Sequence, residues 1–322
     1  MIKGSRCLVT GGAGFIGGHL VQELLRRGAD DVVILDSLRA GSRDAVAAPS
    51  AGCRLVEFQL GRDCVHALRP HLDDVDYVFH LAAEKHGQAQ HHPETALDSN
   101  VDGTYCLARA AGEAGVKRMV FASTLYVYGR TNGPAFVETE TPLPHTIYGI
   151  SKLAGEHLLR HCHARYNLSY NVLRYFFTYG PGQSAGTGYT SVITKTFERL
   201  LLGQRPVIHG DGKQVLDYLY VGDVIDATIV AAESEALNDV FNIGSGLRTS
   251  IADLVTSMVT ISCRDLPIVY DEPDETSGSS RVADILKAAG RLHWHPQTSL
   301  MDGLTMTYDW LASQRKSAPG AR

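Results

Sequence analysis

Tyr148 and Lys152 are two side chains of acid–base type that lie four positions apart in the segment Tyr148-Gly149-Ile150-Ser151-Lys152. Residues at this spacing share one face of a helix. A lysine ammonium beside a phenol stabilises the phenolate and lowers the pKa of the phenol from its ordinary value of about 10. The pair therefore predicts a general base for a hydroxyl that is being oxidised.

A glycine-rich segment near the N-terminus predicts dinucleotide binding. Its three glycines have GxxGxxG spacing: Gly11, Gly14 and Gly17. Such glycines let the backbone approach a pyrophosphate, which also meets the free N–H groups of the following helix, beginning at Phe15 and Ile16. Asp36 ends the next apolar run. An acid there accepts hydrogen bonds from ribose hydroxyls and repels a 2′-phosphate, so the segment favours NAD(H) over NADP(H).

The elements that must position these residues alternate in type along the first half of the chain. Short apolar runs predict strands at 6–10, 32–35, 54–58, 77–81, 118–122 and 171–176. Helical spacing predicts helices at 15–27, 100–115 and 148–166. Strands that alternate with helices form a parallel sheet with helices on both faces. The predicted fold class is therefore α/β, with a Rossmann-type doubly wound parallel sheet.

After Gly180-Pro181-Gly182 the pattern loosens. Helix-like and turn-like pieces follow at 190–203, 209–213, 249–260 and 299–314. They predict a smaller mixed α/β lobe packed on the C-terminal edge of the sheet. We expect an NAD-binding domain over 1–177 with a returning segment near 217–246, a second lobe over 178–216 and 247–314, and a frayed tail over 315–322.

Composition argues against several other classes of protein. The 322 residues carry a formal net charge of -5 without a basic block, which argues against nucleic-acid binding. No apolar run approaches the ~20 residues of a membrane span. The N-terminus does not resemble a signal peptide, and the six cysteines contain no CxxC pair, so we expect a cytoplasmic protein with reduced thiols. No metal is expected, because the histidines lack further ligands at metal spacing.

Together these motifs resemble the extended short-chain dehydrogenase/reductase family, the NAD-dependent sugar epimerases and dehydratases. The resemblance runs from about Arg6 to Trp310. It rests on VTGGAGFIG (9–17), FHLAA (79–83), STLYVYG (123–129), YGISK (148–152), LRYF (173–176) and FNIGSG (241–246). It implies NAD on the N-terminal sheet, a sugar substrate in the second lobe, a cofactor that stays bound through turnover, and a homodimer.

The resemblance also assigns roles to single residues. It gives Thr124 a hydrogen bond to the reacting hydroxyl, Tyr148 the role of base, and Lys152 that of its partner, which also holds the nicotinamide ribose. Further matches are contacts of the cofactor and the walls of its cleft: Leu81, Ala82, Ala83, Lys85, Asn100 and Phe176. On the adenine side, Leu60 stands where relatives often carry an Asp, so adenine binding is expected to be looser.

The reaction type depends on the two residues after Thr124. The 4,6-dehydratases of this family carry Asp-Glu there, and the sugar-acid decarboxylases usually carry Glu at the second position, whereas this chain has Leu125 and Tyr126. Without these carboxylates an epimerase acting at C4 is expected. A one-way dehydrogenase or keto-sugar reductase, a dehydratase or decarboxylase, and Tyr126 as a proton donor are the alternatives.

The substrate half departs further from the family. Relatives carry an Asn and an Arg on the substrate diphosphate where this chain has Phe177 and Leu216. Either other cations take over in a nucleoside diphosphate sugar, or the substrate lacks a nucleoside diphosphate. The candidate cations are Lys213, Arg281, Lys195 and Arg199. The candidate substrate contacts as a whole are Lys85, Thr124, Tyr126, Phe177, Lys213, Leu216 and Arg281.

Overall fold

The computed structural model describes residues 1–41, 52–129, 133–183, 191–274 and 276–317. Its main sheet has seven strands in the order β11-β6-β5-β4-β1-β2-β3. They are β1 (Arg6–Thr10), β2 (Asp31–Asp36), β3 (Cys53–Glu57), β4 (Tyr77–His80), β5 (Arg118–Thr124), β6 (Tyr170–Tyr175) and β11 (Asp239–Ile243). Every pair in this sheet is parallel. The prediction of a doubly wound parallel sheet is confirmed, and its strand order reverses between β1 and β4, where such sheets bind ligands.

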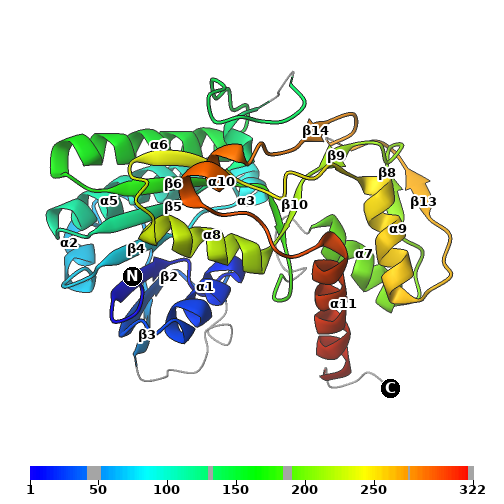
Figure 1. Cartoon of the computed structure of the whole chain (residues 1–322), viewed down its shortest axis with the longest axis horizontal. Coiled ribbons are helices and arrows are strands. Elements are labelled where there is room, and N and C mark those ends of the chain that lie inside the picture. Colours follow the sequence, from blue (N-terminus) through cyan, green and yellow to red (C-terminus); the bar gives the residue numbers. More distant parts are fainter. Residues whose placement is uncertain (42–51, 130–132, 184–190, 275, 318–322) are drawn as a thin grey trace.

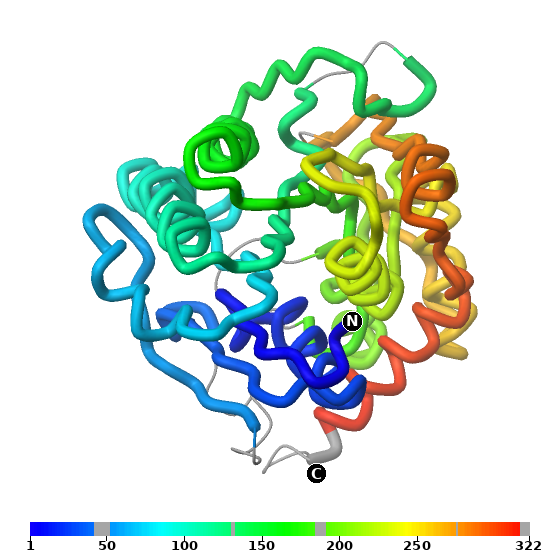
Figure 2. The backbone as a smooth tube through the Cα atoms, turned by 60° about the vertical axis from the view of Figure 1, so that its left-hand side comes forward, coloured from blue at the N-terminus to red at the C-terminus, as the bar shows by residue number. Residues whose placement is uncertain are grey.

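Helices cover both faces of this sheet (Figure 1). One face packs in a hydrophobic cluster with α1 (Phe15–Arg26) and α8 (Val221–Glu233), which also contact each other. The other face packs with α2 (Val65–Leu68), α5 (Gly103–Glu113) and α6 (Ile147–Tyr166). Figure 2 shows the yellow-green α8 returning beside the blue N-terminal segments. Strand β11 then adds to the sheet edge next to β6, so chain far from the N-terminus completes the first half of the fold.

Smaller sheets and three helices form the right-hand part of Figure 1. The strand pairs and triplet are β7 (Phe177–Tyr179) with β10 (Tyr218–Tyr220), β8 (Val207–His209) with β13 (Val269–Asp271), and β12 (Thr249–Ser250), β9 (Val215–Leu216) and β14 (Ser280–Arg281). The helices α7 (Val192–Leu201), α9 (Ile251–Ser262) and α11 (Leu300–Ser317) share one hydrophobic cluster with these strands. The sequence predicted these three helices, although residue 190 lies outside the described residues.

Two segments of the C-terminal region differ from their predicted setting. Helix α10 (Leu286–Leu292) and Trp294 bury side chains in the cluster that contains β1 and α1, so this stretch packs on the large sheet. Helix α11 continues to Ser317, so residues 315–317 are helical and not frayed, while 318–322 lie outside the described residues. No described helix is long and apolar enough to span a membrane.

The glycine loop joins β1 to α1 at the reversal point. Gly11 has a positive φ of 73°, and a Cβ there would lie 2.7 Å from the backbone nitrogen of Ala82. A Cβ on Gly17 would lie 2.1 Å from the carbonyl oxygen of Gly11. Near Gly14 the only atom that a Cβ would meet within 4 Å is the Gly11 oxygen, at 3.2 Å. Gly11 and Gly17 therefore allow tight packing of the loop, whereas Gly14 borders open space.

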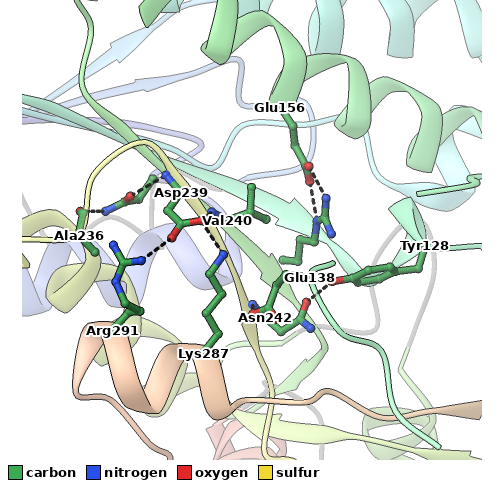
Figure 3. Close-up of polar contacts among 11 residues, drawn as sticks. Tyr128, Glu138, Glu156, Ala236, Asp239, Val240, Asn242, Lys287 and Arg291 are labelled. Atoms are coloured by element: carbon green, nitrogen blue, oxygen red, sulfur yellow. Dashed lines mark hydrogen bonds and ion pairs between the residues drawn. The ribbon is translucent and has the colours of Figure 1, made fainter. Parts of the chain in front are cut away.

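A buried ion pair fixes α6 on the sheet (Figure 3). The guanidinium of Arg174 in β6 donates two hydrogen bonds to the Glu156 carboxylate, at 3.0 and 2.6 Å. Both side chains are about 95% buried, with exposures of 4% and 6%. Ser123 of β5 donates a further hydrogen bond to Glu156, and the Arg174 guanidinium lies over the Tyr128 ring. Strands β5 and β6 thereby hold the helix that carries Tyr148 and Lys152.

We predict that Gly17→Ala destabilises the protein, because the new methyl group would overlap the Gly11 carbonyl and force the loop to shift. Gly290→Ala is the matched control, since a Cβ there meets no atom within 4 Å in helix α10. It should stabilise the fold by about 0.5–1 kcal/mol through helix propensity. Urea denaturation of both variants measures the two effects, and equal midpoints would contradict the packing described.

Glu156→Gln should lower the free energy of unfolding by about 3–5 kcal/mol, because it leaves the Arg174 cation buried without its counter-charge. Glu113→Gln is the control, since Glu113 of α5 forms ion pairs with Arg69 and Arg109 at the surface. Such exposed pairs contribute about 0–1 kcal/mol. Chemical denaturation followed by circular dichroism measures the free energy of unfolding of both variants. Equal decreases would show that the buried ion pair does not stabilise the fold more than the surface pairs do.

Candidate active site

Thr124 and Tyr148 meet where β5 ends and α6 begins. Thr146 caps the helix by accepting a hydrogen bond from the Gly149 N–H, which places Tyr148 in the first turn. A Cβ on Gly149 would lie 2.4 Å from the Tyr126 carbonyl oxygen, so the glycine allows the short helix η4 (Leu125–Val127) to lie against α6. The Thr124 side chain lies close enough to the Tyr148 hydroxyl to lower its pKa. The structure thus brings the predicted base to the predicted hydroxyl contact.

The electrostatics of the Tyr–Lys pair differ from the prediction. Burial raises the pKa of Tyr148 to about 12, with the Thr124 side chain only partly opposing it. Burial lowers the pKa of Lys152 to about 7, against the opposing charge of Glu156. The Lys152 ammonium lies 4.7 Å from the centroid of the Phe121 ring, and Lys152 is not among the groups that shift Tyr148. The expected lowering of the Tyr148 pKa is therefore wrong for this structure, because burial raises the pKa and Lys152 does not oppose it.

Two aromatic side chains lie beside the Tyr148 ring, and one of them also contacts a cation. His86 and Tyr126 lie with ring centroids 6.5 and 5.9 Å from that of Tyr148, and 4.8 Å from each other. The guanidinium carbon of Arg281 lies 5.7 Å from the centroid of the Tyr126 ring. His86 was not predicted from the sequence. Its only signal was its position shortly after the strand β4, where loops of parallel sheets carry function.

Asp36 secures the glycine loop to the end of β2. Its carboxylate accepts hydrogen bonds from the backbone N–H of Ala13 at 2.9 Å and of Leu38 at 2.8 Å, one on each oxygen. Each oxygen keeps a lone pair for another donor. The side chain is only 7% exposed. A dinucleotide fits these residues, because Gly14 borders open space, the first turn of α1 has no side-chain cap, and Asp36 offers acceptors beside the loop.

A buried histidine that the sequence did not single out aligns the loop after β4. His80 bonds to Thr10 of β1 at 2.7 Å and to Thr104 of α5 at 2.8 Å. Thr104 donates its proton to the Asn100 carbonyl, so His80 donates to Thr104 through Nε2 and accepts from Thr10 through Nδ1. Burial holds the pKa of His80 well below its usual range, which keeps it neutral. The Ala82 N–H then donates to Thr10 Oγ1.

Asn100 and Lys85 occupy different settings. Asn100 is 1% exposed, and its amide exchanges hydrogen bonds with the backbone of Glu84 and donates to Ser151 of α6. It therefore ties the loop after β4 to α6. Lys85 is exposed at the start of α3 (His86–His91). Leu81, Ala82 and Ala83 directly follow β4 in the sequence, and all three are half-buried. Leu60 is 4% exposed and lies in the core against α5. Its side chain has no polar atom that could bind adenine.

The predicted substrate contacts separate into two groups. Phe177 packs on Tyr218 with ring centroids 5.9 Å apart, next to Phe176, the predicted wall of the cofactor cleft, which is buried against Phe136. Leu216 is 3% exposed and lies beside Arg281 in the paired strands β9 and β14. Lys213 instead is 85% exposed, pairs with Asp211, and borders a separate cavity of about 640 Å³ with Val215 and Ser280. The side chain of Lys213 is therefore engaged with Asp211 at the surface, whereas Leu216 beside Arg281 is buried.

Comparison with known proteins agrees with this geometry. Residues 7–244 match the NAD dependent epimerase/dehydratase family. A putative UDP-glucose 4-epimerase of Methanocaldococcus jannaschii is 33% identical, covering 96% of this chain and 99% of its own. A dTDP-glucose 4,6-dehydratase of Streptomyces griseus is 32% identical, covering 96% and 94%.

Solved structures show the same architecture. The UDP-glucose 4-epimerase of Thermotoga maritima, solved with UDP-glucose, superposes with a TM-score of 0.88 at 34% identity, covering 96% of this chain and 99% of that one. The family match covers residues 7–244, and the sequence relatives and the solved structure cover 96% of the chain. The chain belongs to the NAD-dependent epimerase/dehydratase family.

Proposed function

We propose that this protein is an NAD-dependent epimerase of a nucleoside diphosphate sugar that acts at C4. The observation that carries the proposal is the position of Tyr148 near Thr124, close enough for Thr124 to lower its pKa, beside Leu125 and Tyr126 where an elimination would need acids. Two carboxylates on neighbouring elements are already engaged: Glu156 binds Arg174 and Glu84 binds Arg39. Oxidation and re-reduction of one hydroxyl needs only a proton acceptor and a hydride acceptor.

In this mechanism Thr124 orients the substrate hydroxyl and Tyr148 removes its proton, then returns it. NAD, when bound, supplies the hydride acceptor and, after reduction, the donor. Tyr148 has a pKa of about 12, so its phenolate forms only when positive charge comes close. Lys152, with a pKa of about 7, gains its proton more readily when an anion forms on the same helix face. The two groups therefore favour each other's charged form during proton transfer.

Further residues are assigned to the two ligands. For NAD, the proposal uses the glycine loop, Asp36 on the ribose, and the walls given by Leu81, Ala82, Ala83, Lys85, Asn100 and Phe176. For the substrate, it uses Thr124, Tyr126, Phe177, Leu216 and Arg281. The NAD side spans 1–177 with 217–246, and the substrate side spans 178–216 and 247–314, apart from the stretch around α10 that packs on the large sheet. A homodimer in the cytoplasm completes the proposal, and the five buried free cysteines are consistent with a reducing compartment.

Asp36→Asn should raise the Kd for NAD roughly tenfold or more. An amide has one acceptor oxygen, so either the Ala13 or the Leu38 N–H loses its partner, and charge-assisted bonds to the ribose are lost. The preference for NAD over NADP should also narrow, because the negative charge is gone. Asp31→Asn at the other end of β2 is the control. Fluorescence titration with both cofactors measures the effect, and unchanged affinity would argue against Asp36 as the ribose contact.

The proposed reaction is tested by measuring whether NADH accumulates when UDP-glucose or UDP-galactose is the substrate. An epimerase interconverts them without accumulating NADH, whereas a one-way dehydrogenase forms NADH in proportion to product. A dehydratase would release water, which mass spectrometry detects as a loss from the sugar. We expect interconversion at constant NADH absorbance, and net NADH or dehydrated product would contradict the epimerase assignment.

Tyr148→Phe should lower the turnover of that reaction by about 10²–10⁴-fold, because it removes the group that exchanges the proton. NAD binding should remain near the wild-type value, since the glycine loop and Asp36 are untouched. Tyr105→Phe on α5 is a control for loss of a tyrosine hydroxyl outside the site. Steady-state kinetics and NAD titration together decide the question, and near-normal turnover in Tyr148→Phe would remove Tyr148 from the mechanism.

A further inference from the structure

A continuous chain of buried hydrogen bonds joins the glycine loop to helix α5. The hydroxyl of Thr10, the last residue of β1, lies 2.7 Å from Nδ1 of His80, and Nε2 of His80 lies 2.8 Å from the Thr104 hydroxyl. Thr104 donates to the Asn100 carbonyl at 2.6 Å. All four residues are at most 1% exposed. A hydrogen bond lost here would leave a buried polar group without a partner, which costs more than the loss of a bond at the surface.

The chain of hydrogen bonds continues from Asn100 into the first turn of α6. The Asn100 amide donates to the Ser151 hydroxyl at 3.1 Å, and Ser151 donates to the Tyr148 carbonyl at 2.9 Å. Ser151 is fully buried as well. The backbone that carries the proposed base is therefore linked to Thr10, which directly precedes Gly11 of the glycine loop.

His80 also reaches the lysine of the Tyr–Lys pair, through an aromatic ring. Its ring centroid lies 5.4 Å from that of Phe121 in β5, and the Lys152 ammonium lies 4.7 Å from the same Phe121 centroid. Gly155 of α6 makes room for this ring, because a Cβ there would lie 2.7 Å from Phe121 Cζ. The imidazole thus contacts the ring on which Lys152 lies, while its hydrogen bonds lead to Tyr148.

This arrangement requires an uncharged imidazole of one tautomer. Thr104 gives its proton to the Asn100 carbonyl, so Nε2 of His80 must donate to Thr104. Nδ1 then accepts the proton of Thr10. A protonated ring would carry N–H groups on both nitrogens, so Thr10 would lose its acceptor and a second cation would stand near Lys152. Burial and the charge of Lys152 both lower the pKa of His80, which agrees with the neutral form.

We propose that His80 is a positioning residue for proton transfer, which holds Tyr148 and Lys152 in register with the glycine loop. The inference rests on the proposed function, because the step that it supports is the proton exchange at Tyr148. His80 acts through Thr104 on one side and through Phe121 on the other. A displacement of about 1 Å between reacting groups can lower a rate about 100-fold. A change in this network should therefore lower kcat more than it changes KM.

Thr104→Val tests this inference with a small change in shape. It removes the acceptor of His80 Nε2, so the imidazole gains by moving its proton to Nδ1. Steady-state kinetics with UDP-glucose should show kcat lowered roughly 10–100-fold and KM within about twofold of wild type. Thr104→Ser keeps the hydroxyl and should recover most of the loss.

Thr228→Val is the matched control for the loss of a buried threonine hydroxyl. Thr228 of α8 is 0% exposed, donates to the Val224 carbonyl at 2.6 Å, and lies 2.7 Å from the Tyr175 hydroxyl. Thr104 likewise donates to a carbonyl four residues earlier and bonds to one further side chain. Thermal unfolding should show similar destabilisation in both Val variants, whereas kcat of Thr228→Val should stay near the wild-type value.

The tautomer of His80 gives a readout that does not depend on turnover. Nitrogen-15 NMR of the histidine-labelled wild-type protein at neutral pH should show a neutral ring protonated at Nε2, with His80→Gln used to assign the signal. In Thr104→Val the proton should move at least partly to Nδ1. A wild-type ring protonated at Nδ1 or at both nitrogens would contradict the direction of the network and overturn the inference.

The kinetic results can overturn it independently. Equal kcat values in Thr104→Val and Thr228→Val would show that the network does not position the base. A kcat in Thr104→Ser as low as in Thr104→Val would assign the loss to packing and not to the hydroxyl. Wild-type protein that converts neither UDP-glucose nor UDP-galactose would contradict the proposed function itself, and the inference would fall with it. That result is distinguishable from the others because it appears before any substitution is made.

Discussion

The buried ion pair between Glu156 and Arg174 is the constraint on which the active site depends. It joins α6 to β6, and Ser123 of β5 adds a third bond to the same carboxylate. Two charges out of water must remain together, so the rotation of α6 about its axis is fixed. Lys152 lies one turn and Tyr148 two turns before Glu156, and Thr124 directly follows Ser123. One interaction thereby places all three residues of the proposed mechanism.

The same burial sets the charge state of the site. Desolvation raises the pKa of Tyr148 to about 12, which favours the neutral phenol, and lowers that of Lys152 to about 7, which brings its two charge states close to balance at neutral pH. In the proposed mechanism Tyr148 would therefore need positive charge nearby before it could accept a proton.

The substrate side follows a different physical principle from the cofactor side. On the cofactor side the protein offers backbone groups and the carboxylate of Asp36, which also holds the glycine loop. The hydrogen bonds from Thr10 through His80 to Thr104 align the neighbouring loop. Around the substrate, short paired strands present Phe177, Leu216 and one half-buried cation, Arg281. Discrimination there would come from the match of a single charge in apolar surroundings, where a missing anion is costly.

The sequence by itself determined the sheet, the glycine loop, Asp36 and the Tyr–Lys spacing. Local patterns suffice for these features, because the spacing of apolar residues and the residue preferences of turns act over only a few residues. The sequence also indicated that a segment near 217–246, which holds α8 and β11, returns to the first half of the fold. Only the tertiary structure decided the packing of α10 on the large sheet and the exposed position of Lys213 beside Asp211. It also reversed the expected pKa of Tyr148, since a pattern records which residues are near in sequence, whereas desolvation depends on every atom packed around a group.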